Sequence, residues 1–155
     1  GGTSLAYFVM KQLPVLPPEA SQKRFLEQNS KKTSIEWIRP RVLELVYTTG
    51  DLKSWAEEQG YEGPPFAWNP ERRFTIRCEL DAAFFHLYGV ERDDVDYIME
   101  QFPIVKRKDE NTYGEYRTKN TILRYYDRMK EAMEGGKPFE SEIDPPPGDK
   151  RASVE

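Results

Sequence analysis

Residues 71–88, ERRFTIRCELDAAFFHLY, constrain the fold more than any other segment of this sequence. Their apolar side chains would occupy most of the circumference of a helix, and no run with the period of a strand competes convincingly anywhere in the chain. A helix that is apolar nearly all round has to be covered by the rest of the protein. We therefore expect this segment to be the central helix of a mainly α, irregular multi-helix domain, ended by Gly89.

Two helical patterns precede the central helix. Residues 33–36, TSIE, have the spacing of a capping box, and apolar residues follow at helical intervals as far as Thr49. Pro40 interrupts this pattern, so the helix either kinks there or begins near it, with Pro40 in its first turn. A second, short helix is expected from Asp51, as its cap, through Gln59. Phe66 and Trp68 then offer two large apolar anchors for the core.

Two more helices are expected after the central one. The first opens with Glu91-Arg-Asp-Asp94, which places three acids at its start, and ends at Pro103. Its inward face carries Val95, Ile98, Met99 and Phe102. Residues 103–115 are expected to form a loop, and the last helix to begin at Thr118 or Asn120 and to end at the glycine pair 135–136. One stripe of that helix carries Ile122, Tyr126, Met129 and Met133.

The chain divides into three parts by composition. Residues 1–32 are expected to be a connector from an upstream domain, with a short helix over 4–12, the proline-rich exit LPVLPP and a polar loop. Residues 33–134 form the helical domain. Residues 135–155 are rich in proline and acids, which predicts a flexible acidic tail, apart from an anchor at Phe139 or Ile143. The start without Met, close to several apolar residues, suggests a fragment of a longer protein.

The inventory of reactive side chains is small. One cysteine, Cys78, excludes an internal disulfide, and one histidine, His86, excludes a metal site built from several His or Cys ligands. Both lie in the apolar helical run, so we interpret them as packing residues. No glycine-rich phosphate loop follows a strand pattern, and the Asn-Pro-Pro-aromatic motif that holds a target amine is absent. We expect no catalytic, cofactor-binding or metal-binding residue in this chain.

The charge is unevenly distributed along the sequence. The whole chain has a net charge of −4, but residues 103–130 carry eight basic and four acidic side chains. Within this block, PIVKRKDENTYGEYRTK combines cations, which attract phosphates, with tyrosines and hydroxyls, which can stack or donate hydrogen bonds to sugar and phosphate. A loop in front of a helix would also offer free N–H groups to a phosphate. The candidate residues for nucleic-acid contact are Lys106, Arg107, Lys108, Tyr113, Tyr116, Arg117, Thr118 and Lys119. The alternative interpretation of this charged block is a solvated helix surface, with its Tyr and Arg side chains packing the loop onto a helix.

Four stretches together resemble a known family. They are YFVMKQLPVLPPEA (7–20), WIRPRVLELVYTT (37–49), RCELDAAFFHLYGV (77–90) and VDYIMEQFPIVKRKDENTYGEYRTKNTILRYYDRM (95–129). This combination is similar to the C-terminal region of large adenine-N6 DNA methyltransferases of type II restriction-modification systems, some of which carry a nuclease in the same chain. One departure is Glu91, which stands where family members tend to have Ser or Thr before the acidic turn.

The resemblance implies a parent enzyme that transfers methyl from S-adenosylmethionine to adenine in double-stranded DNA. This chain would be its C-terminal helical domain, which supports target recognition and contacts the DNA backbone. The catalytic and cofactor-binding residues would lie upstream of Gly1. The alternative is a structural or protein-interaction module that packs on the rest of the parent without touching DNA. Neither a membrane-spanning run nor a signal peptide is present, so we expect a cytoplasmic protein without a membrane partner.

Overall fold

The computed structural model describes residues 15–17 and 33–154, and within them the regular structure is helical. This confirms the expectation of a mainly α, multi-helix fold. Val15 to Pro17, inside the predicted proline-rich exit, are not helical. The predicted short helix at 4–12 and the polar loop at 21–32 lie outside the described residues.

Helix α3 (Ser34–Val46) begins where the capping box predicts. The Thr33 hydroxyl accepts from the Glu36 N–H, and the Glu36 carboxylate accepts from the Thr33 N–H. Pro40 lies inside the helix, so the helix begins before it and not near it. A 3₁₀ turn, η1 (Gly50–Leu52), leads into α4 (Lys53–Glu58). Asp51 belongs to that turn and caps nothing, because the N-cap of α4 is Leu52.

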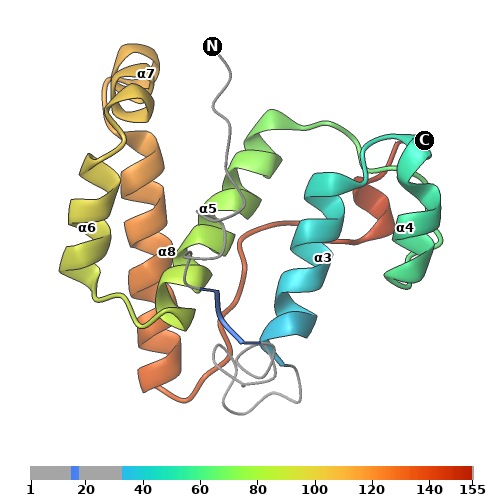
Figure 1. Ribbon diagram of the computed structural model, residues 1–155, viewed down its shortest axis with the longest axis horizontal. Helices are drawn as coiled ribbons and strands as arrows, with labels where there is room; N and C mark the ends of the chain where they lie inside the picture. Colours follow the sequence, from blue (N-terminus) through green and yellow to red (C-terminus); the bar gives the residue numbers. More distant parts are fainter. Residues whose placement is uncertain (1–14, 18–32, 155) are drawn as a thin grey trace.

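Helix α5 (Pro70–Leu87) lies at the centre of the molecule, between α3 on one side and α8 (Arg117–Glu134) on the other (Figure 1). Asn69 caps it and Pro70 occupies its first turn. The expectation that it is buried nearly all round is only partly met. Ile76, Ala82 and Ala83 are fully buried, but Phe84 is 40% exposed.

Helices α6 (Arg92–Glu100) and α7 (Pro103–Tyr113) lie against α8 (Figure 1). Val95 and Met99 form the buried face of α6, whereas Phe102 is half exposed, contrary to the sequence prediction. The side chain of Glu91 makes no capping hydrogen bond to α6. Ser or Thr there would supply one, so this departure from the family pattern leaves the helix start without a side-chain cap.

The predicted loop at 103–115 is wrong, because most of it is helix α7. Pro103 also occupies the first turn of α7. Proline is tolerated there because the N–H that it lacks would have no hydrogen-bond partner within the helix. Gly114 then takes a left-handed conformation with φ of 76°, which ends α7 and lets α8 begin at Arg117. The last helix therefore starts one residue before the earlier of the two predicted positions and ends, as predicted, at the glycine pair.

Two apolar clusters hold the helices together. The larger lies among α3, α5, α6 and α8 and includes Trp37, Ile76, Val95, Ile122 and Met129. The smaller joins the end of α3 to α4 and to the segment before α5. Its buried members are Leu43, Tyr47, Ala56, Tyr61 and Phe66.

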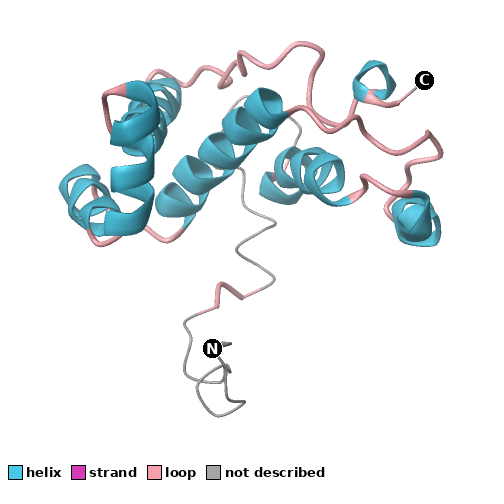
Figure 2. Ribbon diagram, turned by 90° about the horizontal axis from the view of Figure 1, so that it is seen from above, coloured by secondary structure: helices cyan, strands magenta, loops and turns pink. Residues whose placement is uncertain are grey.

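Residues 137–154, here called the strap, run back from the end of α8 across α3 and α5 (Figures 1 and 2). The prediction of a flexible tail is wrong. Phe139 and Ile143 are both buried, which confirms the predicted anchors. Near its end, the strap accepts a hydrogen bond from Ala67 N at Ala152 O, 2.9 Å away, and pairs Ser153 with Phe66 in an isolated β-bridge.

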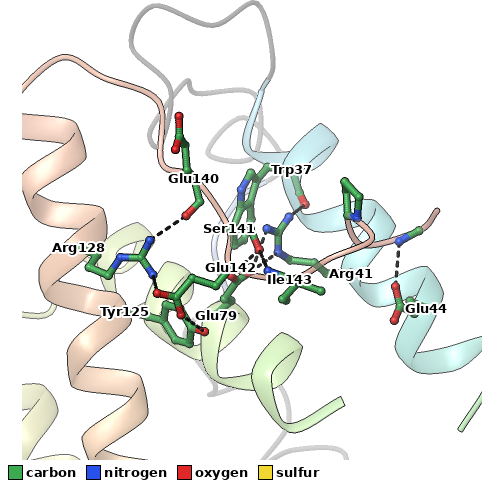
Figure 3. Close-up of polar contacts among 12 residues, drawn as sticks. Trp37, Arg41, Glu44, Glu79, Tyr125, Arg128, Glu140, Ser141, Glu142 and Ile143 are labelled. Carbon is green, nitrogen blue, oxygen red and sulfur yellow. Dashed lines mark hydrogen bonds and ion pairs between the residues drawn. The ribbon is translucent and has the colours of Figure 1, made fainter. Parts of the chain in front are cut away.

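Buried charges fix the strap to the helices (Figure 3). Glu79 of α5 is fully buried. It accepts from the Arg41 guanidinium at 2.8 and 3.0 Å and from the Ser141 hydroxyl at 2.7 Å. A second buried carboxylate, Glu44, accepts from Arg72 and from the Gly148 N–H. The acidic composition that suggested disorder therefore has a different role, since Glu142 of the strap also pairs with arginines of α8.

Candidate nucleic-acid interface

The predicted DNA-binding residues all lie on α7 and on the first turn of α8 with the residue before it. The fold brings them to one end of the molecule (Figure 1). It also gives several of them partners that the sequence did not reveal. These partners separate the set into cations held in ion pairs, cations exposed to solvent and residues used in packing.

Two lysines form ion pairs with one carboxylate of α6. Lys106 Nζ lies 2.8 Å from one oxygen of Glu100, and Lys119 Nζ lies 2.5 Å from the other and 3.0 Å from Asp96. The hydrogen bond from Lys106, followed by that from Lys119, lowers the pKa of Glu100, and the pKa values of both lysines are raised by their hydrogen bonds to it. These cations join α6, α7 and α8.

Arg117 ties the start of α8 to the first turn of α5. It forms an ion pair with Glu71, and its guanidinium carbon lies 4.1 Å from the ring centre of Phe74 and 4.6 Å from that of Tyr113. The hydrogen bond to Glu71 raises the pKa of Arg117, and the same bond lowers the pKa of Glu71. A guanidinium held by a carboxylate and two rings is mainly a structural clamp.

Arg107 and Lys108 are the remaining two cations of the set. Both are exposed, and within residues 33–154 neither forms an ion pair. They lie in the middle of α7, so the helix fixes the position of their backbone and leaves the side chains in water. These are the cations whose charge is available to a phosphate.

The tyrosines and the threonine have different environments. Tyr116 is 5% exposed and donates its hydroxyl hydrogen to Met99 O at 2.9 Å, so it has no free ring face for stacking. Tyr113 is half exposed, with Arg117 over its ring. Thr118 donates its backbone N–H to the buried carboxylate of Asp109 at 2.6 Å. That bond occupies an N–H that we expected to be free for a phosphate.

A cleft of about 550 Å³ separates α5 from α7. Phe74, Ile104 and Val105 line it together with the charged residues Arg77, Asp81 and Lys108. Arg77 was not singled out from the sequence, because residues 51–102 around it carry five basic and twelve acidic side chains, a net charge of −7. Arg77 lines this cleft, and the sequence does not show that α5 and α7 border a common cleft.

The reactive residues of the central helix are packing residues. Burial, followed by the charge of Asp81, raises the pKa of the Cys78 thiol to about 12, so it stays protonated and unreactive at neutral pH. His86 stacks on Tyr126 with ring centres 3.8 Å apart. Within the described part of the chain, no group of three His, Cys, Asp or Glu side chains is arranged to hold a metal, and no helix is both long and apolar enough to cross a membrane.

Comparison with known proteins found no relative of this chain. No family model matches the chain, and no curated protein or solved structure matches it either.

Proposed function

We propose that this chain is the C-terminal helical domain of an adenine-N6 DNA methyltransferase of a type II restriction-modification system. In this proposal it supports target recognition and contacts the backbone of double-stranded DNA. The proposal is supported by the sequence stretches that resemble this family. Two of them form neighbouring helices: 77–90 lies in and just after α5, and 95–129 covers most of α6, all of α7 and most of α8.

The observation that carries DNA contact is the exposure of Arg107 and Lys108. Both project from one rigid helix without an acidic partner among the described residues, so binding a phosphate would break no ion pair. Lys106, Arg117 and Lys119 have such partners and would lose them. We therefore assign the backbone contact to Arg107 and Lys108, and the support of their helix to the other three cations.

Methyl transfer would take place in another part of the parent enzyme. S-adenosylmethionine would need a binding site, and the described residues do not fit one, because they contain no strand followed by a glycine-rich turn. No residue of this chain is assigned to the cofactor or to catalysis. The domain's contribution is to position DNA.

A salt titration tests the proposal. Fluorescence anisotropy with a labelled duplex gives the affinity of the chain at several salt concentrations. The slope of log K against log salt is negative, and each phosphate contact removed reduces its magnitude by about 0.9. We expect the double variant Arg107→Ala/Lys108→Ala to bind duplex more weakly, with a slope smaller in magnitude by about 2.

The matched control removes two exposed lysines of the strap, Lys137 and Lys150. The strap leaves the end of α8 opposite to α7 (Figure 1). This control has the same net charge as the test variant. If both variants bind alike, α7 makes no specific contribution and the assignment to Arg107 and Lys108 is wrong.

A specific observation favours a second candidate, a docking module. Tyr97, Phe102 and Ile104, on and between α6 and α7, are 67%, 50% and 73% exposed. Large apolar side chains left this exposed are typical of surfaces that pack on another protein part. On this alternative the chain ignores duplex DNA, and Ile104→Asp impairs its association with the catalytic part of the parent, measured by co-purification.

A further inference from the structure

Trp68 is the largest exposed side chain next to the core. The sequence predicts it as a core anchor together with Phe66. The structure confirms Phe66, which is 1% exposed, and contradicts Trp68, which is 67% exposed. An exposed tryptophan leaves a large apolar surface in water, which costs free energy unless something covers it.

The backbone around Trp68 is fixed on both sides. Before it, Ala67 donates its N–H to Ala152 O of the strap at 2.9 Å. After it, the side chain of Asn69 accepts from Arg72 N at 3.1 Å and caps α5. The ring is therefore presented by an ordered segment in a defined position.

Arg73 covers one face of the ring. Its guanidinium carbon lies 3.8 Å from the ring centre of Trp68, and its Nη2 donates to Leu45 O of α3 at 3.0 Å. Trp68 and Arg73 occupy the positions before and four residues into the helix at which two apolar side chains usually pack as a staple. Here a cation replaces one of them, and the exposed fraction of Trp68 shows that the contact leaves much of the ring uncovered.

A second arginine of α5 lies near Arg73. Arg77, one turn further along α5 from Arg73, is exposed and has no ion pair within the described residues. Two neighbouring acids are already engaged, Glu44 by Arg72 and Glu71 by Arg117. A third, Asp81, lies one turn after Arg77 on α5: burial raises the pKa of Asp81, and the charge of Arg77 opposes that shift. The pKa of Arg73 is lowered first by burial and then by the charge of Arg77, which indicates that the two cations lie close enough to repel.

We propose that Trp68, backed by Arg73, is a stacking platform for an unpaired base of DNA, with Arg77 next to the phosphate of that nucleotide. An aromatic face beside exposed cations is the arrangement with which proteins bind single strands, since every base has a face that stacks and every nucleotide has a phosphate. A purely apolar protein partner would cover the ring but offer no anionic group to the exposed guanidinium of Arg77. This inference depends on the proposed function, because it requires that the chain bind DNA.

Two variants of the full chain separate stacking from general apolar contact. Trp68→Phe keeps an aromatic face, and Trp68→Leu keeps apolar bulk without one. The probes are a labelled single strand and a duplex of the same length, measured by anisotropy. Trp68→Leu should weaken single-strand binding about 5- to 100-fold, the range of base–aromatic stacking, with duplex binding much less affected. Trp68→Phe should retain most of the affinity.

Three outcomes decide the inference. Equal single-strand affinity in Trp68→Leu and the unaltered chain overturns the platform, and it leaves the proposed function intact if Arg107→Ala/Lys108→Ala still weakens duplex binding. If neither substitution changes any DNA affinity, both proposals fail. If Trp68→Leu changes only co-purification with the catalytic part of the parent, the ring is a protein anchor and the platform is overturned. Circular dichroism shows whether each variant is folded.

Discussion

The ring of His86 lies on Tyr126, and its Nε2 is 2.9 Å from the Tyr126 carbonyl oxygen. Because a carbonyl only accepts hydrogen bonds, the neutral ring carries its proton on Nε2. Burial is the largest influence on this group and lowers the pKa of His86 below its usual range, although the hydrogen bond to Tyr126 acts in the opposite direction. A single histidine in the chain makes its titration easy to isolate.

This residue makes stability depend on pH in a predictable direction. The unfolded chain takes up the proton near the ordinary pKa of about 6.5, whereas the folded chain takes it up only at lower pH. The contribution of neutral His86 to stability is therefore fully present above the unfolded pKa of about 6.5. It is lost progressively as the pH falls from that value through the lower pKa of the folded chain. His86→Phe keeps a stacked ring but cannot titrate. Urea unfolding between pH 7 and 5 should show a smaller loss for this variant, and equal losses would contradict the assignment.

At the scale of elements, α7 is the helix that the sequence does not reveal. Its exposed and charged residues give no strong apolar stripe, since only Asp109 is buried along it. The signals at its two ends are nevertheless present, Pro103 in the first turn and Gly114 after the last. From the sequence, Pro103 is assigned only to the end of the preceding helix, and a loop is therefore predicted at 103–115, where α7 lies. Tertiary contacts with α8 stabilise α7, although its own sequence pattern does not predict a helix.

Gly114 should be sensitive to substitution because of its backbone and not because of crowding. A Cβ there would meet nothing within 4 Å, but the residue has a φ of 76°. Gly114→Ala should destabilise the protein by about 1 kcal/mol, the cost of a left-handed residue less the lost freedom of the unfolded chain. Gly50 has equal space and no positive φ. Gly50→Ala should therefore be neutral or slightly stabilising in urea unfolding, and equal effects at the two positions would refute this account.

At the scale of the whole molecule, the sequence predicts the helical class and most helix positions but not the interactions between distant segments. Periodicity and capping signals are local, so they locate α3, α5, α6 and α8. The partners of Lys106, Lys119 and Arg117 are acids on other helices, and no local pattern connects them. The burial of Tyr116 and the exposure of Trp68 follow in the same way from the assembled fold.

The strap gives the clearest test at this scale. Phe139 packs edge-on against Trp37 and Tyr125, with ring centres 6.2 and 6.4 Å apart. If the strap is part of the core, Phe139→Ala should lower the free energy of unfolding by about 3–5 kcal/mol. The adjacent residue, Glu140, is exposed, and Glu140→Ala should have little effect. Similar small effects in both variants would mean that the segment does not pack in solution.

The hydrogen bond from Gly148 to Glu44 joins residues 104 positions apart, and the one between Tyr61 and Ser153 joins residues 92 apart. Helical domains usually fold fast because their contacts are local, whereas closing loops of this length has an entropic cost before any contact forms. We therefore expect the strap to dock late, after the helices have assembled. In kinetic terms, Phe139→Ala should then accelerate unfolding more than it slows refolding, which the two arms of a chevron plot distinguish.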